Sequence, residues 1–135
     1  MNISIREYQE NDLDGVNIVL YEAFNTTKDN FNYDNIKEVV ALLDNQVVGY
    51  LLLTKVYNPI KKIFYFIVDN VCVLSICRSK GIGKKMLDFV DNIAKENNIS
   101  YITLTSGYQR IEAHKLYEKC GYVKRESNIF KKEVK

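Results

Sequence analysis

The spacing of apolar and polar residues predicts a strand followed by an amphipathic helix at the start of the chain. Residues 3–9 alternate between apolar and polar side chains, as a half-buried strand does. Asn11 and Asp12 then offer a helix N-cap. Apolar residues recur at helical spacing until the polar stretch 25–30, namely Leu13, Val16, Leu20, Ala23 and Phe24. The next stretch, 31–38, is left open between a short helix and a turn.

The middle of the chain reads as three strands. Residues 39–43 and 47–57 are rich in β-branched and aromatic side chains and flank Asp44-Asn45-Gln46, so they predict a hairpin. Residues 63–73 carry apolar side chains on both alternating faces, which is typical of a central strand covered on both sides. The polar pair Asp69-Asn70 interrupts this strand.

The pattern of residues 81–134 predicts two more helices and two more strands. Residues 81–97 form an amphipathic pattern with Ile82, Met86, Leu87, Val90, Ile93 and Ala94 inward. A strand follows at 99–105, then a helix at 109–120 with Gly121 at its C-cap, and a final extended segment at 122–134. This order predicts an α/β fold with a mixed sheet, helices on both faces, and a parallel crossover from the 63–73 strand to the 99–105 strand.

Length and composition are those of one globular domain spanning residues 1–135. Apolar residues make up 47% and charged residues 27% of the 135 residues. The longest apolar run, 47–53, is far shorter than the ~20 residues that span a bilayer, and residues 1–8 lack an apolar signal segment. We therefore expect a cytoplasmic protein without a membrane partner.

Charge is unevenly divided along the chain. Residues 1–60 hold 4 Lys and Arg against 9 Asp and Glu, a net charge of −5, whereas residues 61–135 hold 15 against 8, a net charge of +7. The basic half lacks the clustered stripe and high pI of a DNA-binding domain. A phosphorylated small molecule is therefore favoured as partner over nucleic acid.

Three cysteines and one histidine argue against a metal site. Cys72, Cys77, Cys120 and His114 cannot form the usual four-ligand zinc site without carboxylates. We expect no metal and reduced, buried thiols. A nucleophilic pairing of Cys120 or Cys72 with His114 stays open, although no local signature supports it.

The segment 71–84 carries the clearest chemical signal. A buried strand passes through a short loop into a helix start that holds Gly81 and Gly83, with Arg78, Lys80 and Lys84 around it. Free N–H groups at a helix N-terminus hold phosphate, and glycines let it approach the backbone. The alternative is a tight turn without a ligand. The segment matches neither a Walker loop nor a Rossmann fingerprint.

Two motifs resemble those of the GNAT superfamily of acyl-CoA-dependent N-acetyltransferases. Arg78-Ser79-Lys80-Gly81-Ile82-Gly83 resembles the family's Arg/Gln-x-x-Gly-x-Gly/Ala signature. Residues 113–122 resemble its Ala-x-x-Phe/Leu-Tyr-x-x-x-Gly-Phe/Tyr segment, and the element order matches nearly the whole chain. The resemblance implies a mostly antiparallel, twisted mixed sheet with helices on both faces and a parallel strand pair splayed around an acyl-CoA site.

The resemblance also implies roles for individual residues. Val71 and Val73 are expected to pair with the pantetheine arm of acetyl-CoA, and Tyr117 to protonate the departing thiolate. A purely packing role for Tyr117 is the alternative. Backbone amides are expected to bind the cofactor pyrophosphate along Arg78, Ser79, Lys80, Gly81, Ile82, Gly83 and Lys84.

Asp69 falls where members of the family often carry a Glu that takes a proton from the substrate amine. The shorter side chain would act through a bridging water, and a purely structural Asp is the alternative. Asn70 beside it could orient substrate. A proton acceptor is needed because an ammonium cannot attack a thioester.

Arg110 and His114 lie in a string, 105–114, that resembles a bacterial subgroup including the aminoalkylphosphonate acetyltransferases. Arg110 stands where many members have an Asn that contacts the cofactor, so it could hold a cofactor phosphate or an anionic substrate group. A solvated arginine is the alternative. For His114, a packing or capping role competes with contact to substrate.

Together these features predict an acetyl-CoA-dependent N-acetyltransferase that acetylates a primary amine of a small molecule by direct attack. A non-catalytic acyl-CoA sensor and a protein N-terminal or lysine acetyltransferase are the alternatives. The acceptor's identity stays open, because the acidic first half favours a cation while Arg110 favours an anionic group. A homodimer also stays open.

Overall fold

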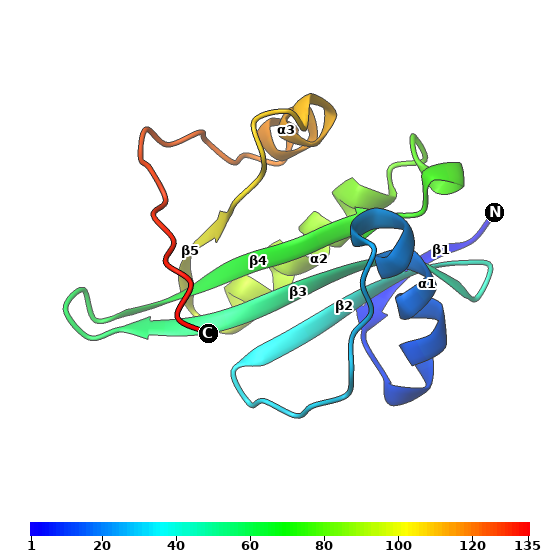
Figure 1. The fold of residues 1–135 in the computed structure, drawn as a ribbon, viewed down its shortest axis with the longest axis horizontal. Helices are drawn as coiled ribbons and strands as arrows, with labels where there is room; N and C mark the ends of the chain where they lie inside the picture. Colours follow the sequence, from blue (N-terminus) through cyan, green and yellow to red (C-terminus); the bar gives the residue numbers. More distant parts are fainter. The chain divides into compact units, whose positions relative to one another are not determined.

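The computed structural model describes residues 1–135, which divide into two compact units, Met1–Thr105 and Ser106–Lys135. The first unit holds one sheet and two helices (Figure 1). The second unit holds one helix and a segment without regular structure.

The sheet of the first unit has five strands in the order of the sequence. Neighbouring strands are antiparallel, except that the last pair is parallel as predicted. The strands are β1 (Ile3–Glu7), β2 (Ile36–Leu43), β3 (Gln46–Asn58), β4 (Ile63–Val73) and β5 (Ile99–Leu104). The mixed sheet predicted from the alternation pattern is thus confirmed.

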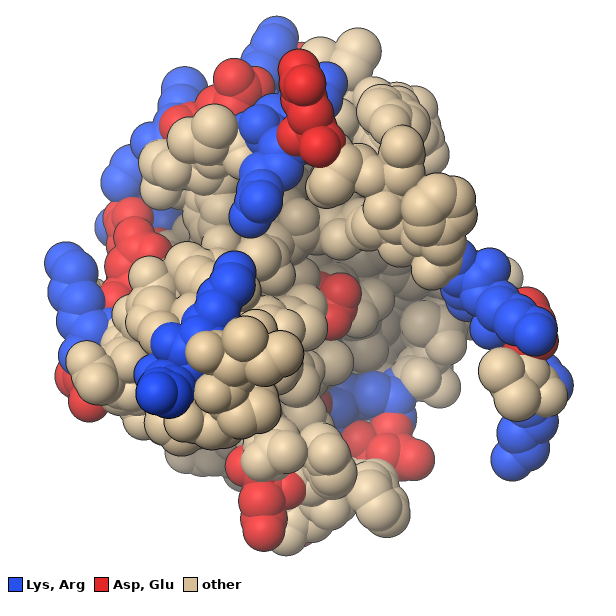
Figure 2. Space-filling model, turned by 90° about the vertical axis from the view of Figure 1, so that its left-hand side faces the viewer, with Lys and Arg blue, Asp and Glu red and all other residues tan.

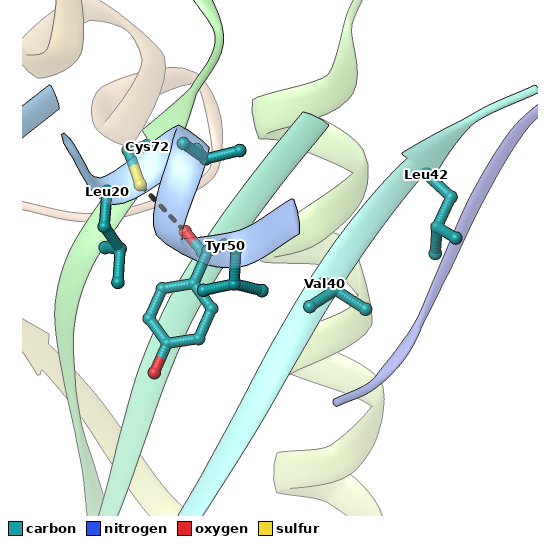
Figure 3. Packing of buried hydrophobic residues seen from close by; sticks show 7 residues of the cluster. Leu20, Val40, Leu42, Tyr50 and Cys72 are labelled. Atoms are coloured by element: carbon teal, nitrogen blue, oxygen red, sulfur yellow. Dashed lines mark hydrogen bonds between the residues drawn. The ribbon is translucent and has the colours of Figure 1, made fainter. Parts of the chain in front are cut away.

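Two helices cover opposite faces of this sheet (Figure 1). One is α1 (Leu13–Phe24), which follows the single turn η1 (Glu10–Asp12), and the other is α2 (Ile82–Glu96). Residues of α1 pack on strands β2, β3 and β4 in a buried cluster, shown in Figure 3, made of Val16, Val19, Leu20, Val40, Leu42, Tyr50 and Cys72. The first unit therefore has three layers, helix, sheet and helix.

The α2 helix packs closely because a glycine faces it. A Cβ built on Gly49 would lie 3.2 Å from the Met86 sulfur and 3.1 Å from the Ala41 Cβ, both tighter than ordinary contacts. The inward positions predicted for this helix are all buried, namely Ile82, Met86, Leu87, Val90, Ile93 and Ala94. Helical spacing thus identified the packed face.

The segment 25–35, which we call the α1–β2 segment, contains neither helix nor strand. Strand β2 begins at Ile36, inside the stretch that the sequence left open. Polar contacts replace regular structure here: Asn17 of α1 accepts the Lys28 N–H at 2.8 Å and donates to the Lys28 carbonyl at 3.4 Å. The segment is therefore tied to α1.

In the second unit, α3 (Ile111–Lys119) ends at Cys120, and Gly121, at φ 92°, lies one position beyond the C-cap predicted for it. The prediction of an extended strand at 122–134 is wrong, because these residues form no strand. A strand needs the backbone hydrogen bonds of a partner strand, and the local sequence of a segment does not show whether a partner is present. Val123, Ile129 and Phe130 are accordingly exposed.

No helix is long and apolar enough to cross a membrane. Basic and acidic side chains are interspersed over the face shown in Figure 2.

Candidate functional site

Strands β4 and β5 pair over only part of their length. Their parallel register runs from Phe64 opposite Ile99 to Val68 opposite Leu104. Beyond Val68, β4 continues to Val73 with β3 as its only neighbouring strand. Val71 and Val73, expected to pair with a ligand chain, therefore lie on a stretch of β4 whose other edge has no strand partner.

A β-bulge shapes this stretch of β4. Its register shifts between Tyr50 and Leu52 of β3, and Asn70 has a left-handed φ of 58°. Leu52 pairs with Asp69 and Tyr50 with Cys72, so the bulge places Asp69 on the same face of the sheet as Cys72, the face that α1 covers. Asp69 and Asn70 are both exposed.

The loop after β4 is anchored at both ends. The Glu22 carboxylate of α1 accepts the Ser75 N–H at 2.7 Å and the Ser75 hydroxyl at 3.0 Å. Cys77, at the end of the turn η2 (Ser75–Cys77), is buried, and the Arg78 Nε donates to the Val73 carbonyl at 3.4 Å. Sequence reasoning missed Glu22, because no local motif links it to Ser75.

The N-terminus of α2 follows this loop and has no side-chain cap. Gly81 is its N-cap residue at φ 79°, no side chain caps it, and its first turn holds no acidic residue. The first N–H groups of a helix have no partner within the helix, and the helix dipole favours an anion there. The structure thus fits the predicted phosphate site.

The residues predicted to line this site contribute in different ways. Arg78, Ser79, Lys80 and Gly81 are exposed, with Ser79 at a left-handed φ of 67°. Ile82 is buried, at 2% exposed, and Gly83 is half-buried. The Lys84 ammonium pairs with Asp88 at 2.9 Å across one turn of α2.

The second unit holds the other predicted residues. Tyr117 is 7% exposed and its ring meets that of Tyr122 edge-on, with centroids 6.2 Å apart. The His114 Nε2 lies 2.8 Å from the Gly107 carbonyl oxygen, a contact to backbone. Arg110 is exposed at the N-cap of α3. Asp69 and Tyr117 thus come from different units.

The three cysteines form no disulfide. Cys72 and Cys77 are buried and Cys120 is half-buried. The Cys72 thiol donates to the Tyr50 carbonyl at 3.7 Å. His, Cys, Asp and Glu side chains form no group of three or more that could hold a metal ion.

Comparison with known proteins agrees with this architecture. The acetyltransferase (GNAT) family matches residues 2–122. The chain is 33% identical over 95 residues to an uncharacterized N-acetyltransferase, YhdJ, of Bacillus subtilis strain 168, covering 70% of this chain and 66% of that protein. A second one, YhfO, is 24% identical over 84 residues and is covered over 56% of its length.

Solved structures share the fold at low identity. A ribosomal-protein-alanine N-acetyltransferase from Brucella melitensis biovar Abortus 2308 superimposes with a TM-score of 0.83 at 19% identity, over 98% of this chain and 100% of that one. An aminoglycoside acetyltransferase from an uncultured soil metagenomic sample gives 0.86 at 20% identity, over 98% and 97%. The chain belongs to the GNAT acetyltransferase family.

Proposed function

We propose that the protein transfers the acetyl group of acetyl-CoA to a primary amine of a small molecule by direct attack, without a covalent enzyme intermediate. One observation carries the proposal: the unpartnered edge of β4 leads through an anchored loop into the N-terminus of α2, which has no side-chain cap. This arrangement suits an extended molecule that carries phosphates next to an amide-bearing arm.

Each part of that arrangement matches a part of acetyl-CoA, which is a cosubstrate here. The β4 edge from Asp69 to Val73 offers backbone N–H and C=O groups to the amides of the pantetheine arm. The N–H groups at the start of α2 suit the pyrophosphate, with Arg78 and Lys80 supplying positive charge nearby. No metal is needed for this binding.

The chemistry assigned to the chain's own residues is acid–base catalysis. Asp69, exposed at the bulge of β4, takes the proton of the acceptor ammonium through water. The free amine then attacks the thioester carbonyl, and the carbon–sulfur bond breaks as the new carbon–nitrogen bond is completed. Tyr117, assigned from its motif, gives its proton to the thiolate, and the surplus proton on the new amide nitrogen passes through water to the tyrosinate.

Coenzyme A should therefore raise the melting temperature of the protein, which scanning fluorimetry measures. A ligand that binds only the folded state adds about 2.7 kcal/mol at a hundredfold excess over Kd, a rise of several degrees. Gly83→Asp should abolish that rise, because it places a carboxylate in the first turn of α2 where phosphate is expected.

A matched control separates this effect from unfolding. Asn92→Asp adds the same charge on an exposed position of α2 away from its N-terminus and should keep the rise. Without ligand, Gly83→Asp should melt at or above the parent temperature, because an acidic side chain near a helix N-terminus is stabilising. A parent protein unmoved by millimolar coenzyme A would contradict the proposal.

A further inference from the structure

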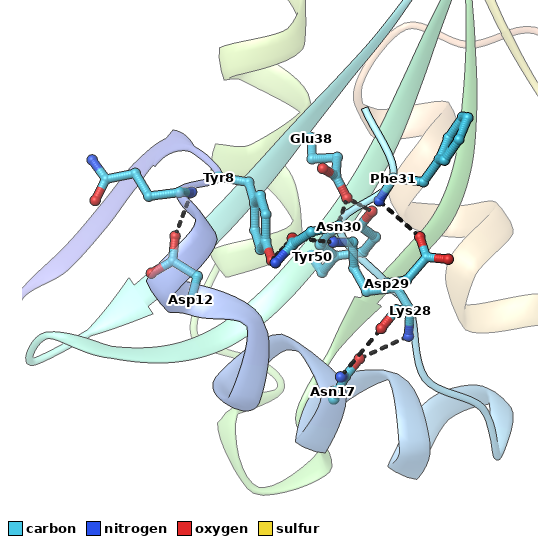
Figure 4. Close-up of polar contacts among 10 residues, drawn as sticks. Tyr8, Asp12, Asn17, Lys28, Asp29, Asn30, Phe31, Glu38 and Tyr50 are labelled. Carbon is cyan, nitrogen blue, oxygen red and sulfur yellow. Dashed lines mark hydrogen bonds and ion pairs between the residues drawn. The ribbon is translucent and has the colours of Figure 1, made fainter. Parts of the chain in front are cut away.

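A polar cluster on the α1 side of the sheet has no role in the site described so far. Tyr8, Asn30, Glu38 and Tyr50 point toward one another in Figure 4, and we call these four residues the cage. They come, in this order, from the residue that follows β1, the α1–β2 segment, β2 and β3. All four belong to the first unit.

The cage holds the ammonium group of the chain's own Lys28. The Lys28 Nζ lies 3.2 Å from a Glu38 carboxylate oxygen, 3.3 Å from the Asn30 amide oxygen and 4.0 Å from the centroid of the Tyr8 ring. The side chains of Lys28 and Glu38 are 14% and 17% exposed. A carboxylate, an amide oxygen and an aromatic face are the groups that recognise an ammonium.

Hydrogen bonds among its own members fix the walls of the cage. The Tyr50 hydroxyl donates to Glu38 and the Tyr8 hydroxyl donates to Asn30, each at 2.6 Å. Burial is the main cause that raises the pKa of Tyr50, and the hydrogen bond to Glu38 is the second. The phenol therefore remains a neutral donor. Glu38 and Tyr50 stand on strands and Tyr8 directly follows β1, whereas Lys28 sits with Asn30 on the α1–β2 segment, which has no regular structure.

Glu38 of the cage and Asp69 lie in one row of paired residues that runs across the strands of the sheet. Glu38 of β2 is opposite Leu52 of β3, and Leu52 is opposite Asp69 of β4. Residues directly opposite each other share a face, and two strand spacings make roughly 10 Å. Glu38 and Asp69 therefore lie on one face with a single residue between them.

We propose that the cage binds the distal ammonium of a diamine acceptor whose other amine lies at Asp69, and that Lys28 occupies the cage until this acceptor displaces it. The inference rests on the proposed function and narrows its substrate class. Lys28 shows which chemical group the cage takes, and its position on an irregular segment lets it leave. The net charge of −5 in the first 60 residues also favours a cationic ligand.

The test is the preference for a diamine over a monoamine, taken as the ratio of Kd for 1-aminopentane to Kd for 1,5-diaminopentane. Isothermal titration calorimetry measures both constants without turnover, on the protein saturated with coenzyme A and on the protein alone. Lys28→Met should raise the ratio by about tenfold, since it removes the competing ammonium. Lys28→Arg, which keeps a cation in the cage, should stay near the parent ratio.

Two further variants make the result specific. Glu38→Gln in the Lys28→Met background should bring the ratio back toward one, because the cage loses its charge. Lys37→Met is the control: it removes the neighbouring lysine of β2, whose Nζ lies 3.5 Å from Glu7, and should leave the ratio at the parent value. Melting temperatures show whether each variant is folded.

The outcomes separate this inference from the proposed function. Folded Lys28→Met and Lys28→Arg proteins with the same ratio as the parent would overturn the inference, whether or not acetyl transfer occurs. A ratio that follows the predicted order in a protein that acetylates no amine would support the cage and contradict the proposed function.

Discussion

At the scale of single residues, Tyr117 is assigned the most demanding step, protonation of the leaving thiolate. Tyr117→Phe removes one hydroxyl and should lower kcat by about ten to a thousandfold, within an order of magnitude of the ~10²–10⁴-fold typical of general acid catalysis. Its KM for acetyl-CoA and its melting temperature should stay close to the parent values. Steady-state kinetics and fluorimetry on the one variant measure all three quantities.

Tyr21→Phe is the matched control, because Tyr21 is 60% exposed on α1 and loses the same atom. The kcat of Tyr21→Phe should equal that of the parent protein. An unchanged kcat for Tyr117→Phe would assign this buried side chain to packing alone.

Asp69 is the second residue whose role can be isolated. Asp69→Asn keeps the shape of the side chain but cannot accept the proton, so kcat/KM for the amine should fall while the Kd of acetyl-CoA barely changes. Asp69→Glu should retain activity, because it restores a carboxylate and reaches further toward the amine. If the pH profile of Asp69→Asn matches that of the parent at full rate, the proton leaves by another path.

At the scale of elements, the start of α1 is fastened to β1 by an ion pair. Asp12 is 7% exposed, and its carboxylate accepts two bonds from the Arg6 guanidinium, at 2.8 and 3.0 Å, and one from the Gln9 N–H at 2.8 Å. The hydrogen bonds from Arg6 and Gln9 hold the pKa of Asp12 below its ordinary value, against the opposing effect of burial.

Asp12→Asn should therefore cost about 1–3 kcal/mol of the free energy of unfolding at neutral pH. Because the folded-state pKa is the lower one, the stabilisation is present above the ordinary Asp pKa of about 3.9 and is lost as the pH falls through the folded value. The difference between parent and variant should shrink below about pH 4. Urea unfolding at a series of pH values measures it.

Asp14→Asn, at an exposed position in the first turn of α1, serves as control and should change the free energy by less than about 0.5 kcal/mol. A difference between Asp12→Asn and the parent that persists unchanged into acid would contradict this account of the pair.

Elements also show how far the sequence alone could predict the fold. The 82–96 helix and the 63–73 strand were predictable, because burial of one helical face imposes a helical period and burial of both strand faces imposes a nearly continuous apolar run. The final strand at 122–134 was not predictable, because these residues have no partner strand and the local sequence does not show whether a partner exists. Pattern predicts which face could be buried and not what covers it.

The same limit applies to the candidate site. The glycines and basic residues of 78–84 are contiguous, so the phosphate site was readable as a motif. Tyr8, Lys28, Glu38 and Tyr50 are far apart along the chain and match no motif, and only the pairing of β1, β2 and β3 brings them together. The Glu22–Ser75 contact escaped prediction for the same reason.

At the scale of the whole molecule, the uneven charge agrees with two ligands of opposite sign. The acidic first 60 residues include Glu38 of the cage, and the basic remainder includes Arg78 and Lys80 beside the α2 N-terminus. A polyanionic cosubstrate and a cationic acceptor would each meet the charge that attracts it. Acetyl transfer from one to the other is the central claim.

Turnover of acetyl-CoA with a panel of primary amines tests that claim most directly. The panel contains monoamines and diamines, free thiol is followed colorimetrically, and mass spectrometry identifies the acetylated product. We expect thiol release above the amine-free rate for at least one amine, with one N-acetylated product formed for each thiol released. Folded protein that binds coenzyme A yet releases no thiol above the amine-free rate with any amine would contradict the account and leave an acyl-CoA-binding protein without transferase activity.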